Sequence, residues 1–198
     1  MTENTNISNY IFYLSYLNRK LCRFFKQQSP YIHCKKGCAK CCKTGYYPMS
    51  KIEFDYLMVG FLQLPVDTQQ KIKEKIKKIK EAKLQSDKNF VYDCPFLINN
   101  ECSVYNFRSI LCRSFGLMSI NNDGGATKIP FCAYEGLNYS NVIDTKTQTI
   151  SQEKFDKLDI AEEPLAYNIS YPFLTSKEIE KNFEINFGDK KPLIDWFD

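Results

Sequence analysis

Cysteine is the residue type in this chain best suited to do chemistry, because eight of the nine cysteines fall into two groups. The first group spans nine consecutive residues and consists of Cys34, Cys38, Cys41 and Cys42. The second group consists of Cys94, Cys102, Cys112 and Cys132. A disulfide needs opposed Cβ vectors, which the sequence neighbours Cys41 and Cys42 rarely offer each other. Eight thiolates match two four-ligand sites for zinc or iron–sulfur clusters, so the pattern predicts that all eight bind metal.

The spacing within the first group indicates how it could bind. The turn Cys38-x2-Cys41 places two sulfurs on one side of the backbone, where both can bind one metal. The vicinal Cys41 and Cys42 are expected to project apart, so that Cys42 serves a second, nearby centre. Which other cysteine completes which centre stays open. Vicinal cysteines at this density favour an iron–sulfur cluster slightly over Zn²⁺, with mononuclear iron as a further alternative, at about two sites.

Other chemistry fits these residues less well. The first three cysteines have the spacing of the radical S-adenosylmethionine loop, but that family usually has an aromatic residue where this chain has Lys40. The strand–helix repeats of its barrel are also missing from the pattern. His33, the only histidine, is expected to be structural or exposed, and it allows no catalytic triad. Cys22 is expected to be a small buried hydrophobic residue beside a helix's apolar stripe.

Charge and hydropathy argue against a nucleic-acid-binding protein and against a membrane-spanning protein. The 198-residue chain has a formal net charge of +4. Two divalent ions on eight deprotonated cysteines would bring this charge to zero, so the basicity does not indicate a nucleic-acid partner. The N-terminus lacks a signal-peptide pattern, and no window approaches the roughly 18 apolar residues of a membrane span. We expect a cytoplasmic protein without a membrane segment, because in that reducing compartment clustered cysteines chelate metal rather than form disulfides.

Amphipathic helices must hold the first cysteine group in place. Apolar residues recur at helical spacing over about residues 6–27 and predict a helix that ends before Pro30. The loop 29–49 then carries the cysteines. Ser50-x-x-Glu53 is a capping box that predicts a second helix. A third helix is predicted from Pro65 to about Leu84.

The third predicted helix is rich in lysine, at positions 71, 73, 75, 77, 78, 80 and 83. Such a run is usually a solvated face, and the alternative is a docking surface for a protein partner on the Lys71–Lys83 helix. No aromatic residues interleave with these lysines, so the helix offers no stacking platform for nucleic-acid bases.

The second cysteine group begins in a predicted β-hairpin over about residues 90–105. The turn Asn99-Asn100 tolerates left-handed backbone, and the two arms bring Cys94 and Cys102 towards each other. A short helix over about 107–115 is expected to deliver Cys112. Residues 121–125 are predicted to form a turn or loop tip.

The C-terminal third contains no cysteine after Cys132. Helices are predicted over about 151–160 and, behind the capping box Thr175-x-x-Glu178, over about 176–186. The predicted fold is therefore mainly α with a short β-hairpin, in which an irregular metal-stapled cysteine core is flanked by amphipathic helices. Its predicted parts are an N-terminal amphipathic helix (1–29), a cysteine-cluster metal-binding domain (30–140) and a C-terminal helical segment (141–198) packed on it.

Two separated blocks of sequence agree in order and residue type with a known family. They are Cys34-Lys-Lys-Gly-Cys38-Ala-Lys-Cys41-Cys42 and the later run Cys94-Pro-Phe-Leu, Cys102-Ser-Val-Tyr105-x-x-Arg108 and Leu111-Cys112-Arg113. Over about residues 30–133 the chain resembles the bacterial YkgJ-type cysteine-cluster family, also described as CxxCxxCC zinc- or iron-chelating proteins. The resemblance implies a metal-chelating domain whose ligands are the eight grouped cysteines. The chain departs from the family pattern at Ala39, Asn106 and Ser109, none of which is a ligand position.

The resemblance implies a structural or redox metal-binding protein. The cysteine blocks are also similar to those of the longer flagellin lysine N-methylases, which leaves open a small metal-dependent enzyme of methyltransferase or oxidoreductase type. A third alternative is a zinc-stapled interaction module that presents the basic helix. Arg108 and Arg113 are expected to donate hydrogen bonds to metal-bound thiolates, the alternative being exposed arginines on a short helix.

Overall fold

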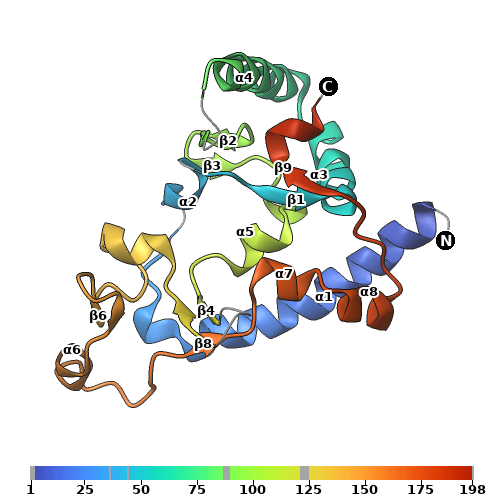
Figure 1. The fold of residues 1–198 in the computed structure, drawn as a ribbon. Coiled ribbons are helices and arrows are strands. Elements are labelled where there is room, and N and C mark those ends of the chain that lie inside the picture. The colour runs from blue at the N-terminus through green and yellow to red at the C-terminus, as the bar shows by residue number, and fades with distance from the viewer. Residues whose placement is uncertain (1–2, 36, 44, 87–89, 121–124, 198) are drawn as a thin grey trace.

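The structure is a computed structural model that describes residues 3–35, 37–43, 45–86, 90–120 and 125–197. Helices hold 51% of these residues and strands 12%, which confirms the mainly α prediction. The strands form small sheets of two or three members rather than one hairpin alone (Figure 1). None of the described helices is long and apolar enough to cross a membrane.

The longest helix, α1 (Glu3–Gln27), packs along one side of a hydrophobic core. Its apolar face buries Tyr10, Tyr13, Leu14, Leu17 and Leu21. The C-terminal helices α7 (Tyr171–Leu174) and α8 (Lys177–Phe183) lie against it, with the Tyr13 hydroxyl donating to the Leu174 carbonyl at 2.7 Å (Figure 1). The two ends of the chain are therefore packed together through this core.

A second core lies under α3 (Lys51–Leu62) and α4 (Val66–Leu84). The predicted capping box opens α3, because the Ser50 backbone N–H donates to Glu53 Oε2 at 2.9 Å. Strand β1 (Pro48–Ser50) precedes this helix and pairs antiparallel with β9 (Lys190–Pro192), which leads into the 3₁₀ helix η4 (Leu193–Trp196). The C-terminal segment thus adds a strand beside the first cysteine loop.

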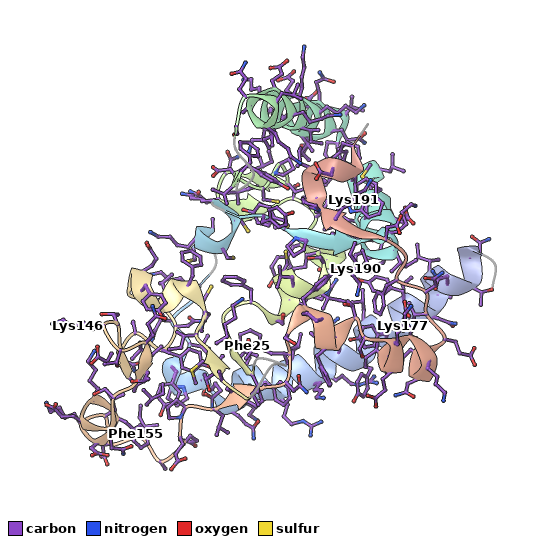
Figure 2. The ribbon with its side chains drawn as sticks, in the orientation of Figure 1. Phe25, Lys146, Phe155, Lys177, Lys190 and Lys191 are labelled. Carbon is purple, nitrogen blue, oxygen red and sulfur yellow. The ribbon has the colours of Figure 1, made fainter. Side chains whose placement is uncertain are left out.

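The lysines of α4 and β9 divide between solvent and internal contacts. Lys75 donates to the Leu97 carbonyl, Lys80 donates to the Phe197 carbonyl at 2.7 Å, and Lys83 pairs with Asp195. On β9, Lys190 donates to the Thr175 carbonyl at 2.9 Å, and the neighbouring Lys191 lies 4.1 Å from the Trp196 ring centroid (Figure 2). The exposed lysines of α4 are 71, 73, 77 and 78.

The predicted hairpin forms between β2 (Leu97–Ile98) and β3 (Glu101–Cys102). Asn99 and Asn100 turn it with φ of 51° and 61°, the left-handed backbone expected of this dipeptide. The helix predicted over 107–115 is split into η2 (Tyr105–Phe107) and α5 (Ile110–Ser114). The split occurs because Ser109 has extended backbone and caps α5, accepting from the Cys112 N–H at 3.4 Å.

A third core joins the residues after α5 to the C-terminal part. β4 (Met118–Ile120) pairs antiparallel with β5 (Thr127–Lys128) and parallel with β8 (Ala166–Tyr167). Beyond β5 lie η3 (Phe131–Glu135), the hairpin β6 (Ile143–Asp144) and β7 (Thr149–Ile150), and α6 (Gln152–Asp156). The predicted turn at 121–125 lies between β4 and β5, and all of it except Gly125 is outside the described residues.

Two local expectations are wrong. The Cys22 side chain is exposed rather than buried, because α1 turns its apolar stripe one position away from it, at Leu21. The cap of α8 is Ser176, whose hydroxyl accepts from the Ile179 N–H at 3.4 Å, and not Thr175. Thr175 is buried instead and donates to the Tyr171 carbonyl at 2.8 Å.

Candidate metal centre

The two cysteine groups meet through the backbone. The Cys94 N–H donates to the Cys42 carbonyl at 2.8 Å, although the two residues lie far apart in the sequence. Gly45 and Tyr92 extend this contact with a reciprocal pair of hydrogen bonds, each of 3.1 Å. An antiparallel bridge therefore holds the end of the first cysteine loop beside the start of the second cysteine segment.

The first loop tightens into the one-turn helix α2 (Lys40–Lys43), which carries Cys41 and Cys42. Ala39 adopts left-handed backbone, with φ of 50°, to begin that turn. The Cys41 and Cys42 sulfurs lie 3.9 Å apart, whereas we expected the two side chains to project apart. The helical turn of α2 places the two sulfurs side by side.

The two thiols affect each other's ionisation. A hydrogen bond from the Cys42 thiol lowers the pKa of Cys41 to about 7. The same bond, together with burial and the neighbouring Cys94 and Cys112, raises the pKa of Cys42 far above its ordinary value. The guanidinium of Arg108 also lowers the pKa of Cys41.

Three of the four cysteines in the second group, namely Cys94, Cys102 and Cys112, lie near Cys42. Burial raises the pKa of Cys94 above the ordinary range of a thiol, and the adjacent Cys112 and Cys102 raise it further. Cys112 keeps an exposed edge, yet desolvation by the surrounding protein, with Cys102 and Cys41 nearby, raises the pKa of this thiol to about 11. The hairpin and α5 thus bring Cys94, Cys102 and Cys112 into one neighbourhood with Cys42.

Cys34, Cys38 and Cys132 form another neighbourhood, which we call the first because it begins earlier in the chain. The neighbourhood around Cys42 is then the second. Desolvation and the adjacent Cys38 raise the pKa of Cys34 to about 11. Desolvation and Cys34 raise the pKa of the buried Cys132 to about 11 as well. Cys41 contributes to the shifts of Cys34 and Cys132 and also to those of Cys102 and Cys112, so it lies between the two neighbourhoods.

Asn138 fixes the first loop to the segment that follows Cys132. Its fully buried side chain accepts from the backbone N–H groups of His33 and Cys34, each at 2.9 Å, and donates to the Gly116 carbonyl at 2.9 Å. At the surface, Lys40 pairs with Glu135 at 2.8 Å. Sequence reasoning missed Asn138, because a single asparagine outside any motif gives no local signal.

The two arginines have different roles. Arg113 is buried, and its guanidinium donates to Asn18 Oδ1, the Arg108 carbonyl and the Asn106 carbonyl, at 3.1, 2.9 and 2.7 Å. Among the described residues these are protein oxygens and not thiols, so Arg113 supports the backbone that leads into α5. Arg108 stacks on Tyr105, with its guanidinium carbon 3.7 Å from the ring centroid. Its charge partly offsets the desolvation that raises the pKa of Cys102 and Cys112.

A cavity of about 370 Å³ is lined by α1 on one side and by the segment that carries Arg108 and Arg113 on the other. Phe25 projects from α1 towards it, and the exposed Cys22 lines the same wall (Figure 2). Arg108 lines the opposite wall, and its buried Nε has no hydrogen-bond partner among the described residues. Buried donors of this kind normally have an acceptor.

The donor set fits a sulfur-ligated metal. Thiolates select zinc and iron–sulfur clusters among the common biological metals, and the imidazole of His33 is exposed. Within the described ranges, no three side chains of His, Cys, Asp or Glu already stand together in the geometry of a metal site. Backbone hydrogen bonds bring the two cysteine groups together. Which cysteines bind metal stays a prediction.

Comparison with known proteins gives one match. A model of the CxxCxxCC family, described as a putative zinc- or iron-chelating domain, matches residues 33–133. The match begins one residue before Cys34 and ends one residue after Cys132, so it contains all eight grouped cysteines and excludes Cys22. No curated protein and no solved structure matches the chain.

Proposed function

Because the chain belongs to the CxxCxxCC family, described as zinc- or iron-chelating, we propose that it binds metal through its eight grouped cysteines. The observation that carries this proposal is the hydrogen bond from the Cys94 N–H to the Cys42 carbonyl, which joins the two groups. Bound metal would supply a cross-link between segments that have little regular structure of their own or, as an iron–sulfur cluster, a site for electron transfer.

We propose two centres, with each neighbourhood of thiols completing one of them. The first would use Cys34, Cys38, Cys41 and Cys132, and the second would use Cys42, Cys94, Cys102 and Cys112. The effect of Cys34 on the pKa of Cys132, and that of Cys112 on the pKa of Cys94, support this division. The 3.9 Å between the Cys41 and Cys42 sulfurs would make the two centres direct neighbours.

Arg108 would then offset the charge of the second centre. Its guanidinium already acts on Cys41, Cys102 and Cys112, and its Nε is a donor without an acceptor. Thiolate sulfur accepts hydrogen bonds from arginine, and such partners stabilise metal-bound thiolates.

The rest of the chain would serve as a scaffold for the cysteine region. We propose that residues 30–140 form the metal-binding unit and that 1–29 and 141–198 pack on it. The pairing of β1 with β9 and of β4 with β8 supports this arrangement, because both sheets join the cysteine region to the C-terminal segment. All nine cysteines are free thiols, which suits the reducing cytoplasm as a location.

Anaerobic purification of the whole chain, followed by analysis of zinc, iron and acid-labile sulfide, tests this function. A brown protein that holds iron and sulfide would identify clusters, and a colourless protein with about two zinc ions per chain would identify structural zinc. Protein free of zinc and iron, after expression with both metals supplied, would contradict the proposal.

A further inference from the structure

The hydroxyl of Tyr47 is a buried donor that lacks a partner. The side chain of Tyr47 packs in the second hydrophobic core and is 9% exposed. Its Oη is buried and makes no hydrogen bond within the described part of the chain. Leaving a hydroxyl unpaired in an apolar environment costs about 1–3 kcal/mol, so such a group calls for an explanation.

The backbone holds this hydroxyl in a specific place. Tyr47 has left-handed backbone, with φ of 45°, a conformation that is costly for an aromatic residue. The ring folds back over Gly45, where an added Cβ would lie 2.4 Å from the ring and 2.8 Å from Oη. A side chain at position 45 would therefore displace the hydroxyl. Gly45 is also the residue that bridges to Tyr92, beside the bond between Cys42 and Cys94.

Cysteines of the second neighbourhood share the core in which this hydroxyl is buried. Cys94 and Cys102 pack against the hydrophobic core that contains Tyr47, and the backbone of Cys42 is hydrogen-bonded to that of Cys94. Burial raises the pKa of Tyr47 well above its ordinary value, with further contributions from Cys94, Cys42 and Cys112 and then from Asp93. A tyrosine hydroxyl keeps its proton at neutral pH even at its ordinary pKa of about 10, so it is available as a donor. The sulfur atoms of these cysteines can accept from it once they lose their protons to metal.

We infer that the Tyr47 O–H donates a hydrogen bond to a sulfur of the second centre and thereby stabilises that centre. Tyr47 is a positioning residue and not a ligand. This inference rests on the proposed function, because it needs metal-bound sulfur at Cys42, Cys94 and Cys112. The left-handed backbone of Tyr47, and the lack of a side chain at Gly45, would then serve to hold the Tyr47 hydroxyl beside the sulfurs.

Tyr10 provides a matched control. Its hydroxyl is also buried and unpartnered among the described residues, and its ring is fully buried. The charged groups that act on Tyr10 are Glu53 and Arg113, with Tyr171 and Tyr13, and none is a cysteine. Tyr10→Phe therefore removes the same atom from a comparable environment that lies away from the sulfurs.

Tyr47→Phe, Tyr10→Phe and wild type are compared by the release of bound zinc or iron to a competing chelator. We expect Tyr47→Phe to release the metal of one centre about 10-fold faster, the lower end of the effect of losing a partner of a metal ligand. Tyr10→Phe should match wild type. If the metal is an iron–sulfur cluster, Tyr47→Phe should also lower the midpoint potential, because a hydrogen bond to sulfur favours the more negative, reduced cluster.

The metal-free proteins give a second readout. Without metal the Tyr47 hydroxyl has no partner among the described residues, so Tyr47→Phe should leave the thermal midpoint of the metal-free form unchanged or raised. Equal chelator release from wild type, Tyr47→Phe and Tyr10→Phe would overturn the inference while leaving the proposed function intact. A wild-type protein that binds no metal would overturn both.

Discussion

Asn138 holds the backbone of Cys34 in place, accepting its N–H at 2.9 Å from a fully buried side chain. The same oxygen accepts from the His33 N–H, and the amide nitrogen donates to the Gly116 carbonyl. Gly116 has φ of 99°, and a Cβ there would lie 2.7 Å from the Asn138 amide nitrogen. One amide thus ties the first cysteine loop to the chain on both sides of Cys132.

Asn138→Ala should therefore loosen the first neighbourhood. It removes three hydrogen bonds, and we expect a loss of about 1–3 kcal/mol in the free energy of unfolding, because buried partners are left unpaired. Denaturant unfolding measures this loss, and metal analysis should show lower occupancy. Asn141→Ala is the control, because Asn141 Oδ1 is buried and has no hydrogen-bond partner within the part of the chain that the structure describes. Equal stability of the two variants would contradict the role of Asn138.

Glu53 organises three elements from one buried carboxylate. Its Oε1 accepts from the Ile110 N–H at 2.9 Å, at the start of the helix that carries Cys112. Its Oε2 accepts from the Ser50 hydroxyl at 2.7 Å and from the Tyr171 hydroxyl at 2.5 Å. Glu53→Ala should cost about 3 kcal/mol or more, since several buried donors lose their acceptor.

Glu81→Ala is the surface comparison for that experiment. Glu81 lies on α4 in an exposed pair with Lys77 at 4.0 Å, and such pairs contribute little. The thermal unfolding midpoints of Glu53→Ala and Glu81→Ala measure the difference in stability between the two variants. A midpoint for Glu53→Ala as high as that for Glu81→Ala would show that the Glu53 network does not stabilise the fold.

Metal binding should release protons. The pKa values of Cys34, Cys112 and Cys132 are raised to about 11, so these thiols are protonated at neutral pH and must lose their protons to bind metal. Metal affinity should therefore fall as the pH is lowered. Zinc titration calorimetry in two buffers of different ionisation enthalpy measures the protons released, and a heat independent of the buffer would contradict thiol ligation.

The same shifts give the metal-free fold a pH dependence with a definite sign. A thiol whose folded pKa is raised above the unfolded value of about 8.5 stabilises the fold below that value. The contribution is lost as the pH rises from about 8.5 towards the folded pKa of about 11. The thermal midpoint of metal-free protein should fall over this interval, and a constant or rising midpoint would contradict the raised pKa values of these thiols.

Chelation should affect the middle of the chain more than its helices. Structural zinc contributes about 10–16 kcal/mol of apparent binding free energy, comparable with the roughly 5–15 kcal/mol stability of a whole domain. We expect metal removal to expose residues 30–48 and 90–133 to protease while α1 and α4 partly survive. Limited proteolysis with mass spectrometry tests this, and unchanged protection of both stretches together with an unchanged circular dichroism spectrum would contradict it.

Local signals in the sequence predicted the three N-terminal helices and the hairpin well. The helix predicted over 151–160 is limited to Gln152–Asp156, and the one predicted over 107–115 is split. The Asn99-Asn100 turn and the Ser50 capping box depend on neighbouring residues, so their outcome could be read from the chain itself. The exposure of Cys22 was missed, because one step around a helix separates a buried position from an exposed one.

Long-range relationships could not be predicted in this way. The contact of Cys42 with Cys94 depends on how two loops cross. Arg108 acts on the thiols, and within the described residues Arg113 does not donate to them, because backbone carbonyls occupy the guanidinium of Arg113. The spacing of Cys41 and Cys42 followed from the turn of α2, which the loop sequence did not signal.

The most direct test of the account is the metal content of single cysteine variants of the whole chain, purified anaerobically. Cys34→Ser and Cys132→Ser should each lower the metal of the first centre, and Cys42→Ser and Cys94→Ser should each lower that of the second. Cys22→Ser, at an exposed thiol outside both neighbourhoods, should retain full content. Full metal content in both Cys94→Ser and Cys132→Ser would contradict the claim that the two cysteine groups hold metal together.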